Sequence, residues 1–324
     1  MSRCLGCLKE INEETYCPSC LKVLFDGNRK IRPILNFDKK DFLEARFELA
    51  EKISISGIQD KISLRLENNE LIPTEKDGTY ILKPIPINPT PRLTDDIPAN
   101  EHLTMQIARQ IFNIRTAENG LIMFSDEELA YITKRFDRSN NKKLRQEDFC
   151  QLSGKTPETA GMHFKYDGSY EEIGKMIFDF VAAPRIEIEK YFFQIVFSYV
   201  FGNGDVHLKN LSIIESPYSD FVLSPAYDMV NTTVHFPSES RMALDLFNDF
   251  ETESFKINGF YKRIDFIKFG EKLSMKSGRI EKFIQYFFDK KNDSINIINR
   301  SFLSSEAKKK YIEIVKDRLK AIHD

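Results

Sequence analysis

The sequence lacks the features that define several large protein classes. It contains no tryptophan, no run of about 18 apolar residues and no long apolar stretch near its start. Without such stretches there is no signal for a membrane span or for secretion, so we expect a cytoplasmic protein with no membrane contact. The 47 basic and 49 acidic residues give a net charge of -2. That balance gives no reason to expect direct nucleic-acid binding.

What is present is typical of an ordinary globular protein. Hydrophobic residues make up 41% of the 324-residue chain and charged residues 30%, which is enough apolar material for a sizeable core. The length corresponds to one large domain or two ordinary ones. The sequence carries neither a G-x-G-x-x-G pattern nor a Walker motif, so two common nucleotide-binding folds have no support.

Periodicity divides the chain into a β-rich part and an α-rich part. Alternating residues predict strands at 61–67, 70–73, 79–84, 117–124 and 129–136, with a hairpin turn at Asn68-Asn69. A proline-rich loop then leads into a helix from Asn100 to about Asn113. Beyond residue 165, helical patterns cover 170–182, 187–201, 262–273, 278–290 and 305–322. We therefore predict an α+β fold with three parts: a cysteine-bearing segment at 1–30, a β-rich N-lobe at 31–140 and an α-rich catalytic C-lobe at 141–324.

A loop with two glycines, 202–211, carries the most informative polar residues. It holds Asp205, His207 and Asn210, and a short strand predicted at 223–227 ends at Asp228. Phosphoryl transfer needs a carboxylate that orients the attacking hydroxyl, and magnesium needs carboxylate and amide oxygens. The spacing therefore predicts Asp205 as the base, with Asn210 and Asp228 as magnesium ligands. His207 either contacts a phosphate or is a structural histidine.

Two further segments fit the same chemistry. Lys83 ends a predicted strand and precedes the helix that begins near Glu101, and a strand lysine held by a helix glutamate is a recurrent phosphate-binding arrangement. In Ser-Ile-Ser-Gly-Ile-Gln-Asp-Lys, at 54–61, one glycine flanked by serines can present N–H groups to phosphate. Taken alone, the first pair also fits a surface lysine and a helix-start glutamate, and the second segment also fits a simple turn.

Four of the five cysteines form two close pairs, Cys4-x2-Cys7 and Cys17-x2-Cys20. In a reducing compartment such pairs indicate a metal more than a disulfide. Four thiolates make a tetrahedral zinc site, which supplies folding energy to a short segment and leaves no open position for catalysis. Two interpretations stay open, namely a structural zinc knuckle and reduced cysteines without metal.

The motifs together resemble those of HipA-like serine/threonine kinases, the toxin components of bacterial toxin–antitoxin systems. The segments at 54–61, Tyr-Ile-Leu-Lys-Pro, Asn-Glu at 100–101, Lys-Arg-Phe-Asp-Arg, Arg-Gln-Glu-Asp-Phe, Gly-Asn-Gly-Asp-Val-His-Leu-Lys-Asn and Pro-Ala-Tyr-Asp occur in the family's order. The resemblance runs from about residue 50 to 320. The segment 54–61 corresponds to a serine loop of the family. Because an extra N-terminal subdomain is missing before this serine loop, the chain is most similar to the compact HipT kinases of HipBST systems.

The resemblance implies a two-lobed, protein-kinase-like fold that uses ATP and magnesium. It implies that Asp205 is catalytic and that Arg135-Phe136 forms the hinge near adenine. The implied nucleotide-binding and metal-binding residues are Lys83, Ser56, Gly57, Lys61, Glu101, Arg135, Phe136, His207, Asn210 and Asp228. Ser54 and Ser56 match autophosphorylation sites. The implied substrate is a translation protein, notably an aminoacyl-tRNA synthetase, and the implied partners are HipS-like and HipB-like antitoxin proteins.

Two alternatives remain at this level. Choline and aminoglycoside kinases share an Asp-x-His-x-x-x-Asn loop, so the chain is alternatively a small-molecule phosphotransferase. A third interpretation is a zinc-nucleated binding protein on an inactive kinase scaffold. The serine loop and the segment 145–149 favour the protein kinase, and the intact set of Lys83, Asp205, Asn210 and Asp228 argues against an inactive scaffold.

Overall fold

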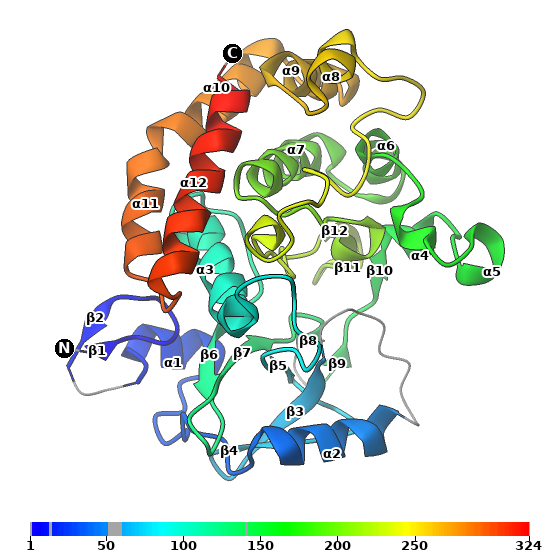
Figure 1. Ribbon diagram of the computed structural model, residues 1–324. Coiled ribbons are helices and arrows are strands. Elements are labelled where there is room, and N and C mark those ends of the chain that lie inside the picture. The colour runs from blue at the N-terminus through cyan, green and yellow to red at the C-terminus, as the bar shows by residue number, and fades with distance from the viewer. Residues whose placement is uncertain (1, 13–14, 51–59, 140–141, 324) are drawn as a thin grey trace.

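The small lobe is built on a curled antiparallel sheet (Figure 1). The structure is a computed structural model that describes residues 2–12, 15–50, 60–139 and 142–323. The five strands lie in the order β4-β3-β5-β7-β6, with bounds β3 Ile62–Glu67, β4 Glu70–Pro73, β5 Tyr80–Lys83, β6 Asn119–Met123 and β7 Leu129–Lys134. Asn68 and Asn69 both have positive φ, as a two-residue hairpin turn requires. The predicted strands are confirmed, with ends shifted by up to two residues.

Helix α3, Ile97–Gln110, packs against strands β6 and β7. It begins three residues before the predicted start because Pro98 is accepted in a first helical turn, where its missing N–H costs no hydrogen bond. Although α3 lies within the range predicted for the N-lobe, its buried side chains, among them Leu103 and Ile107, belong to the core of the large lobe. This helix therefore joins the two lobes.

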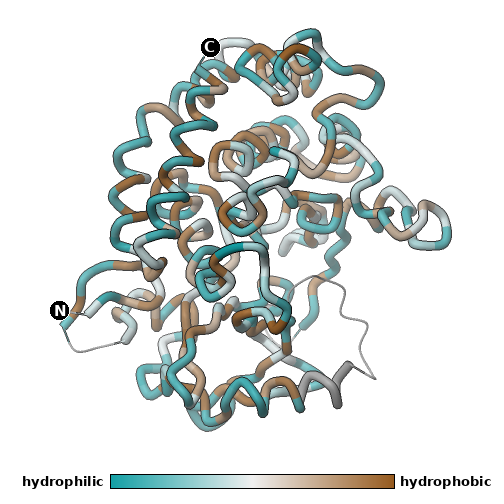
Figure 2. Tube along the Cα trace, viewed as in Figure 1, coloured by the Kyte–Doolittle hydropathy of each residue, from teal (hydrophilic) through white to brown (hydrophobic). Residues whose placement is uncertain are grey.

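The large lobe is mainly helical. The predicted long helices are α6 Tyr170–Phe180, α7 Pro184–Val200, α9 Arg263–Lys272, α10 Ser277–Asp289 and α12 Ser305–Ala321. Further helices are α4 Phe149–Leu152, α5 Pro157–Ala160, α8 Glu253–Asn258 and α11 Lys291–Asn299. Hydrophobic and hydrophilic residues alternate along α10, α11 and α12, as expected for helices with one buried face (Figure 2). The α+β prediction is thus confirmed.

A second, three-stranded sheet adjoins the loop 202–211, which leads directly into its middle strand. Its strands are β10 Gln146–Asp148, β11 Ser212–Glu215 and β12 Phe221–Leu223, in that order. The predicted strand at 223–227 is wrong, because the strand ends where that prediction begins. Pro225 has no N–H to donate, and Asp228 adopts a left-handed φ of 57°. A short hairpin of β8 Arg138–Ser139 and β9 Lys142–Lys143 precedes this sheet.

The N-terminal segment packs beside the small lobe. It contains β1 Ser2–Arg3, β2 Glu10–Ile11 and α1 Pro18–Leu24, and α2 Lys39–Ala50 follows. Leu24 and Phe25 are buried in the small-lobe core. The N–H of Leu121 on β6 donates to Leu5 O at 2.8 Å.

Among the helices formed by described residues, none has the length and apolar character needed to cross a bilayer.

Candidate active site

Lys83, at the end of β5, lies where the two lobes meet. Its Nζ donates to Glu101 Oε1 of α3 at 2.6 Å and to Asp228 Oδ1 of the large lobe at 2.5 Å. Nζ also lies 5.6 Å from the centre of the Tyr131 ring. Lys83 and Glu101 are buried, whereas 42% of the Asp228 side chain is exposed. The lysine thus holds one fully buried carboxylate and one that is partly buried.

The charges in this cluster shift one another's pKa. Burial acts to lower the pKa of Lys83, but the carboxylates of Asp228 and Glu101 outweigh it and raise that pKa. Burial raises the pKa of Glu101 to about 7, although Lys83 opposes the shift. Burial also acts to raise the pKa of Asp228, but Lys83 and Lys61 lower it to about 2. Burial lowers the pKa of Lys61, which is close enough to interact electrostatically with Asp228, Lys83 and Glu101.

The loop after α7 brings three polar side chains to the same region. Asn210 Nδ2 donates to Asp228 Oδ2 at 2.8 Å, and Asn210 Oδ1 accepts from the N–H of His207 at 3.2 Å. Asp205 Oδ1 accepts from the hydroxyl of Tyr166 at 2.7 Å. Burial lowers the pKa of His207, which favours its neutral form near pH 7. Its Nδ1 has no hydrogen-bond partner within the described part of the chain.

Close packing fixes the backbone of this loop. Gly202 has a φ of 68°, and an added Cβ would lie 2.5 Å from Asn231 Oδ1. At Gly204 an added Cβ would lie 2.6 Å from Ser240 O. The N–H of Gly204 donates to Thr232 Oγ1 at 2.8 Å. Both glycines are therefore needed to bring the chain this close to its neighbours.

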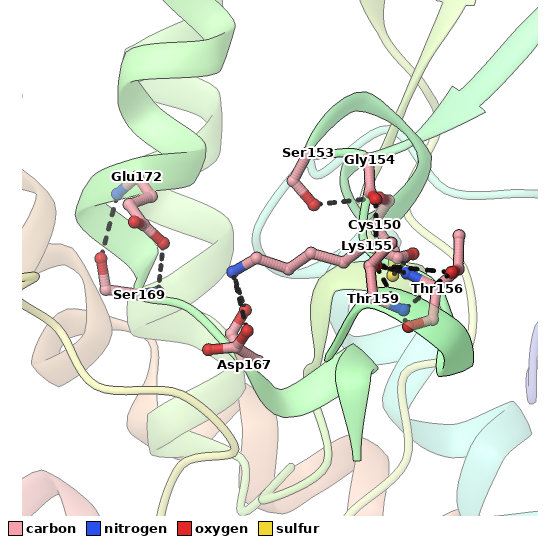
Figure 3. A network of polar contacts seen from close by, with 9 residues as sticks. All are labelled: Cys150, Ser153, Gly154, Lys155, Thr156, Thr159, Asp167, Ser169 and Glu172. Carbon is pink, nitrogen blue, oxygen red and sulfur yellow. Dashed lines mark hydrogen bonds and ion pairs between the residues drawn. The ribbon is translucent and has the colours of Figure 1, made fainter. Parts of the chain in front are cut away.

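Tyr166, which holds Asp205, belongs to a turn that is fixed by polar contacts. Lys155 donates to Asp167 O and forms an ion pair with Asp167 Oδ2 at 3.5 Å (Figure 3). The side chain of Ser169 caps α6 by accepting from the N–H of Glu172 at 3.1 Å. These contacts fix the chain directly after the short helix Phe164–Tyr166. No pattern in the sequence singled out Tyr166.

The predicted hinge residues lie beside an open cleft of about 300 Å³. Arg135 forms a two-pronged ion pair with Asp137, at 2.9 and 2.7 Å, and so its guanidinium is already engaged. The Phe136 ring lies 5.6 Å from the Tyr227 ring, next to Asp228. The cleft is lined by Arg135, Asp137, Lys143, Gln146, Asp148, Gln151, Lys209 and Tyr227. The sequence motifs included Asp137 and Asp148, but neither was predicted to be a site residue.

The structure brings most of the predicted residues together. Contacts or electrostatic interactions link Lys61, Lys83, Glu101, Asn210 and Asp228, while Asp205 and His207 lie on the same loop as Asn210. Arg135 and Phe136 border the neighbouring cleft. Ser54, Ser56 and Gly57 lie outside the described residues. The four paired cysteines form a separate group, with all their Sγ atoms within 4.8 Å of one another.

Comparison with known proteins decides the family. The sequence pattern of the HipA-like C-terminal domain matches residues 53–295. The chain belongs to the HipA-like family. A putative kinase of Haemophilus influenzae is 30% identical in an alignment of 305 positions that covers 89% of this chain and 87% of that protein. The putative kinase Y4dM of Sinorhizobium fredii is 31% identical over 64% of this chain, and the match spans only 52% of that relative.

Solved structures of HipA-like and related kinases share the fold. HipA in the Shewanella oneidensis complex of HipA, HipB and operator DNA superposes with a TM-score of 0.61 at 20% identity, covering 82% of this chain and 63% of that chain. The Helicobacter pylori proinflammatory kinase CtkA gives a TM-score of 0.52 at 18% identity, covering 84% of this chain and 92% of that one. This HipA-like chain therefore spans less than two thirds of the Shewanella HipA chain, and the kinase-like fold is confirmed.

Proposed function

We propose that this HipA-like protein is a toxin-type serine/threonine protein kinase that transfers the ATP γ-phosphate to a protein hydroxyl. The observation that carries the proposal is the convergence on one site of Lys83, Glu101, Asn210 and Asp228, with Asp205 on the adjoining loop. A buried lysine–glutamate pair, a carboxylate–amide pair and a loop aspartate are the groups that phosphoryl transfer requires.

Each group has a defined task in this proposal. Lys83 contacts the nucleotide phosphates, and Glu101 fixes the lysine in position. Asp205, aligned by Tyr166, accepts or orients the proton of the attacking hydroxyl. The cleft beside Arg135 and Phe136 takes the remainder of the nucleotide. Family membership and the names of the relatives support these assignments.

The donor set fits a magnesium ion. Asp228 offers a carboxylate that stays ionised, because its pKa is lowered to about 2. Asn210 would supply its amide oxygen after its amide turns, since Nδ2 is the atom that faces Asp228. Magnesium prefers such oxygen ligands together with phosphate oxygens. When bound, the ion would neutralise charge on the transferring phosphate.

We propose the finer assignments on the family resemblance. The substrate is a translation protein, with an aminoacyl-tRNA synthetase as the first candidate, and the partners are HipS-like and HipB-like antitoxins. The Shewanella neighbour was solved with HipB and operator DNA, which supports a toxin–antitoxin partnership. Autophosphorylation of Ser54 and Ser56 silences the enzyme in this proposal, because the resemblance implies a loop that covers ATP and added phosphate charge on such a loop repels the nucleotide. Mass spectrometry of the purified chain, with Ser54→Ala and Ser56→Ala, tests that regulation.

The central experiment replaces Asp205 with asparagine. We expect Asp205→Asn to lower phosphate transfer from radiolabelled ATP by about 10²–10⁴-fold while Mg·ATP still raises the melting temperature. Asp179→Asn, an exposed residue on α6, is the matched control and should keep full activity. Full activity in Asp205→Asn would remove Asp205 from the mechanism.

The kind of molecule that receives the label from ATP identifies the substrate class. Incubation of the wild-type chain with labelled ATP and a cell lysate should label the chain itself and a protein of the translation apparatus. Labelling of a small molecule with no labelled protein would instead indicate the choline-kinase type of activity. Absence of both transfer and ATP binding would indicate an inactive scaffold.

A further inference from the structure

The four paired cysteines have sulfur positions that suit one tetrahedral metal ion. All four Sγ atoms lie within 4.8 Å of one another, and Cys7 Sγ and Cys17 Sγ are 3.7 Å apart. With Zn–S bonds of about 2.3 Å, neighbouring sulfurs of a tetrahedron lie roughly 3.8 Å apart. Cys4 and Cys20 are also buried. Thiols without a metal gain little stability from lying this close to three others, so the grouping favours a bound ion.

Turns and hydrogen bonds of the backbone bring the four cysteines together, as a metal site requires. The β1–β2 hairpin presents Cys4 and Cys7, and the N–H of Leu8 turns back to Cys4 O at 3.0 Å with a left-handed φ of 64°. Cys17 directly precedes α1, and its N–H donates to Cys4 Sγ at 3.2 Å. Such an N–H group stabilises a thiolate. An added Cβ at Gly6 would lie 2.7 Å from Cys20 Sγ, so only glycine fits there.

This cysteine knuckle, residues 4–12 and 15–20, contacts the helix that carries Glu101. The buried His102 lies with Nε2 2.9 Å from Gly6 O, between the first two cysteines. One end of α3 is held as well, because Gln110 Nε2 donates to Cys7 O at 3.1 Å. Leu8 is fully buried in the same core as α3. In Figure 1 the N-terminal segment lies beside α3 and the small-lobe sheet.

Arg3, directly before the knuckle, contacts the connection between the last two helices. Arg3 donates to Arg300 O at 3.0 Å, just after α11. Together with Arg3, the knuckle therefore contacts the small-lobe strand β6, helix α3 and the connection between α11 and α12.

We propose that Cys4, Cys7, Cys17 and Cys20 bind one zinc ion, and that the zinc knuckle braces α3 so that Glu101 stays beside Lys83. Zinc closes the two cysteine pairs into one unit, which presents the carbonyls of Gly6 and Cys7 to α3. Loss of the metal frees these carbonyls and loosens the helix. The catalytic residues are unchanged, so the brace acts by positioning.

The metal itself is tested by elemental analysis of the full-length chain, purified with the affinity tag removed. We expect about one zinc per chain in the wild type and in Cys150→Ser, whose buried cysteine lies outside the group. The double variant Cys7→Ser/Cys17→Ser should lose the zinc. A cobalt-loaded chain should show the absorption of a tetrahedral thiolate site. Iron in place of zinc, no metal in the wild type, or zinc retained by the double variant would overturn the proposal.

The brace is tested by hydrogen–deuterium exchange, which does not depend on phosphate transfer. Removing zinc with a chelator should speed amide exchange in α3 at least several-fold and leave α7 unchanged. His102→Leu should keep the zinc yet speed exchange in α3, and His102→Gln, which retains a donor, should restore slow exchange. Unchanged exchange in α3 after zinc removal would show that the knuckle does not act on the helix. These readouts stand even if the proposed kinase activity fails.

Discussion

Glu101 is the most unusual single residue in the candidate site, because it is buried and yet lies beside a lysine. Burial acts to keep its proton on, while Lys83 at 2.6 Å acts to remove it, and the resulting pKa is about 7. The carboxyl group therefore titrates near neutral pH, whereas an exposed glutamate titrates near 4.5. The free energy of unfolding should therefore depend on pH between these two values.

We expect the stabilising contribution of Glu101 to fall as pH rises. The folded state binds a proton up to about pH 7 and the unfolded state only up to about 4.5, so the folded state is favoured at the low end of that window. The free energy of unfolding of the wild type relative to Glu101→Gln should decrease from about pH 4.5 to 7 and level off above it. Urea unfolding across this range measures it.

Glu313→Gln, which removes an exposed carboxylate of α12, is the control for the loss of one charge. If the difference between wild type and Glu101→Gln instead stays level across the same window, then the pair is ionised throughout and the raised pKa is wrong.

The sequence identified the site residues that come from motifs and overlooked those that do not. Lys83 and Asp228 are far apart in the chain, yet both were predicted, since each ends a recognisable motif. Tyr166 was overlooked because it lies on a single helical turn whose neighbours show no periodicity. Its position follows from the tertiary contacts of Lys155 and Asp167, which a local pattern does not contain.

At the scale of elements, periodicity located the long helices and missed shorter ones, among them α11. Helix α11 follows α10 after Lys290 alone, and its sequence Lys-Asn-Asp-Ser-Ile-Asn-Ile-Ile-Asn has only three apolar residues. Helix α11 is held by packing, with Ile297 and Ile298 fully buried, and not by a strong pattern. Short helices of this kind depend on the rest of the fold, so sequence patterns detect them poorly.

Two glycines in neighbouring helices should respond to alanine in opposite ways. In α9, a Cβ at Gly270 would lie 2.6 Å from Ile280 Cδ1 and 3.2 Å from a Phe192 ring atom. Gly270→Ala should therefore destabilise the protein by about 1–3 kcal/mol through overpacking. In α10, a Cβ at Gly278 would meet nothing within 4 Å.

Gly278→Ala is thus the matched control and should stabilise the protein by up to about 1 kcal/mol, because alanine favours the helix more than glycine does. Chemical denaturation measures both. Equal and stabilising effects at the two positions would show that α9 and α10 are packed less tightly than the structure has them.

At the scale of the whole molecule, α3 connects three parts through three successive residues. Asn100 exchanges hydrogen bonds with the backbone of Asn231 in the large lobe, at 2.9 and 3.0 Å. Glu101 contacts Lys83 of the small lobe, and His102 contacts Gly6 of the knuckle. Successive helical residues point about 100° apart, which lets one turn reach three neighbours.

Asn100→Leu should loosen the join between α3 and the large lobe. It leaves the N–H and C=O of Asn231 and the ring nitrogen of His235 without their partner. We expect a loss of at least about 2 kcal/mol in the free energy of unfolding, because unpaired buried polar groups are costly. Asn292→Leu, an exposed residue of α11, should change stability by less than about 0.5 kcal/mol. Similar effects from the two variants would show that the hydrogen bonds of Asn100 do not hold α3 to the large lobe.

The three-way junction on α3 also sets which length changes the chain tolerates. Inserting or deleting one residue between Ala99 and Leu103 would turn the helix by about 100°, which moves at least one of the three polar side chains away from its partner. Between residues 87 and 92 the chain is largely exposed, so added residues there leave the helical phase intact. Natural insertions and deletions should therefore occur in that connection and be absent from the helical turn Ala99–Leu103.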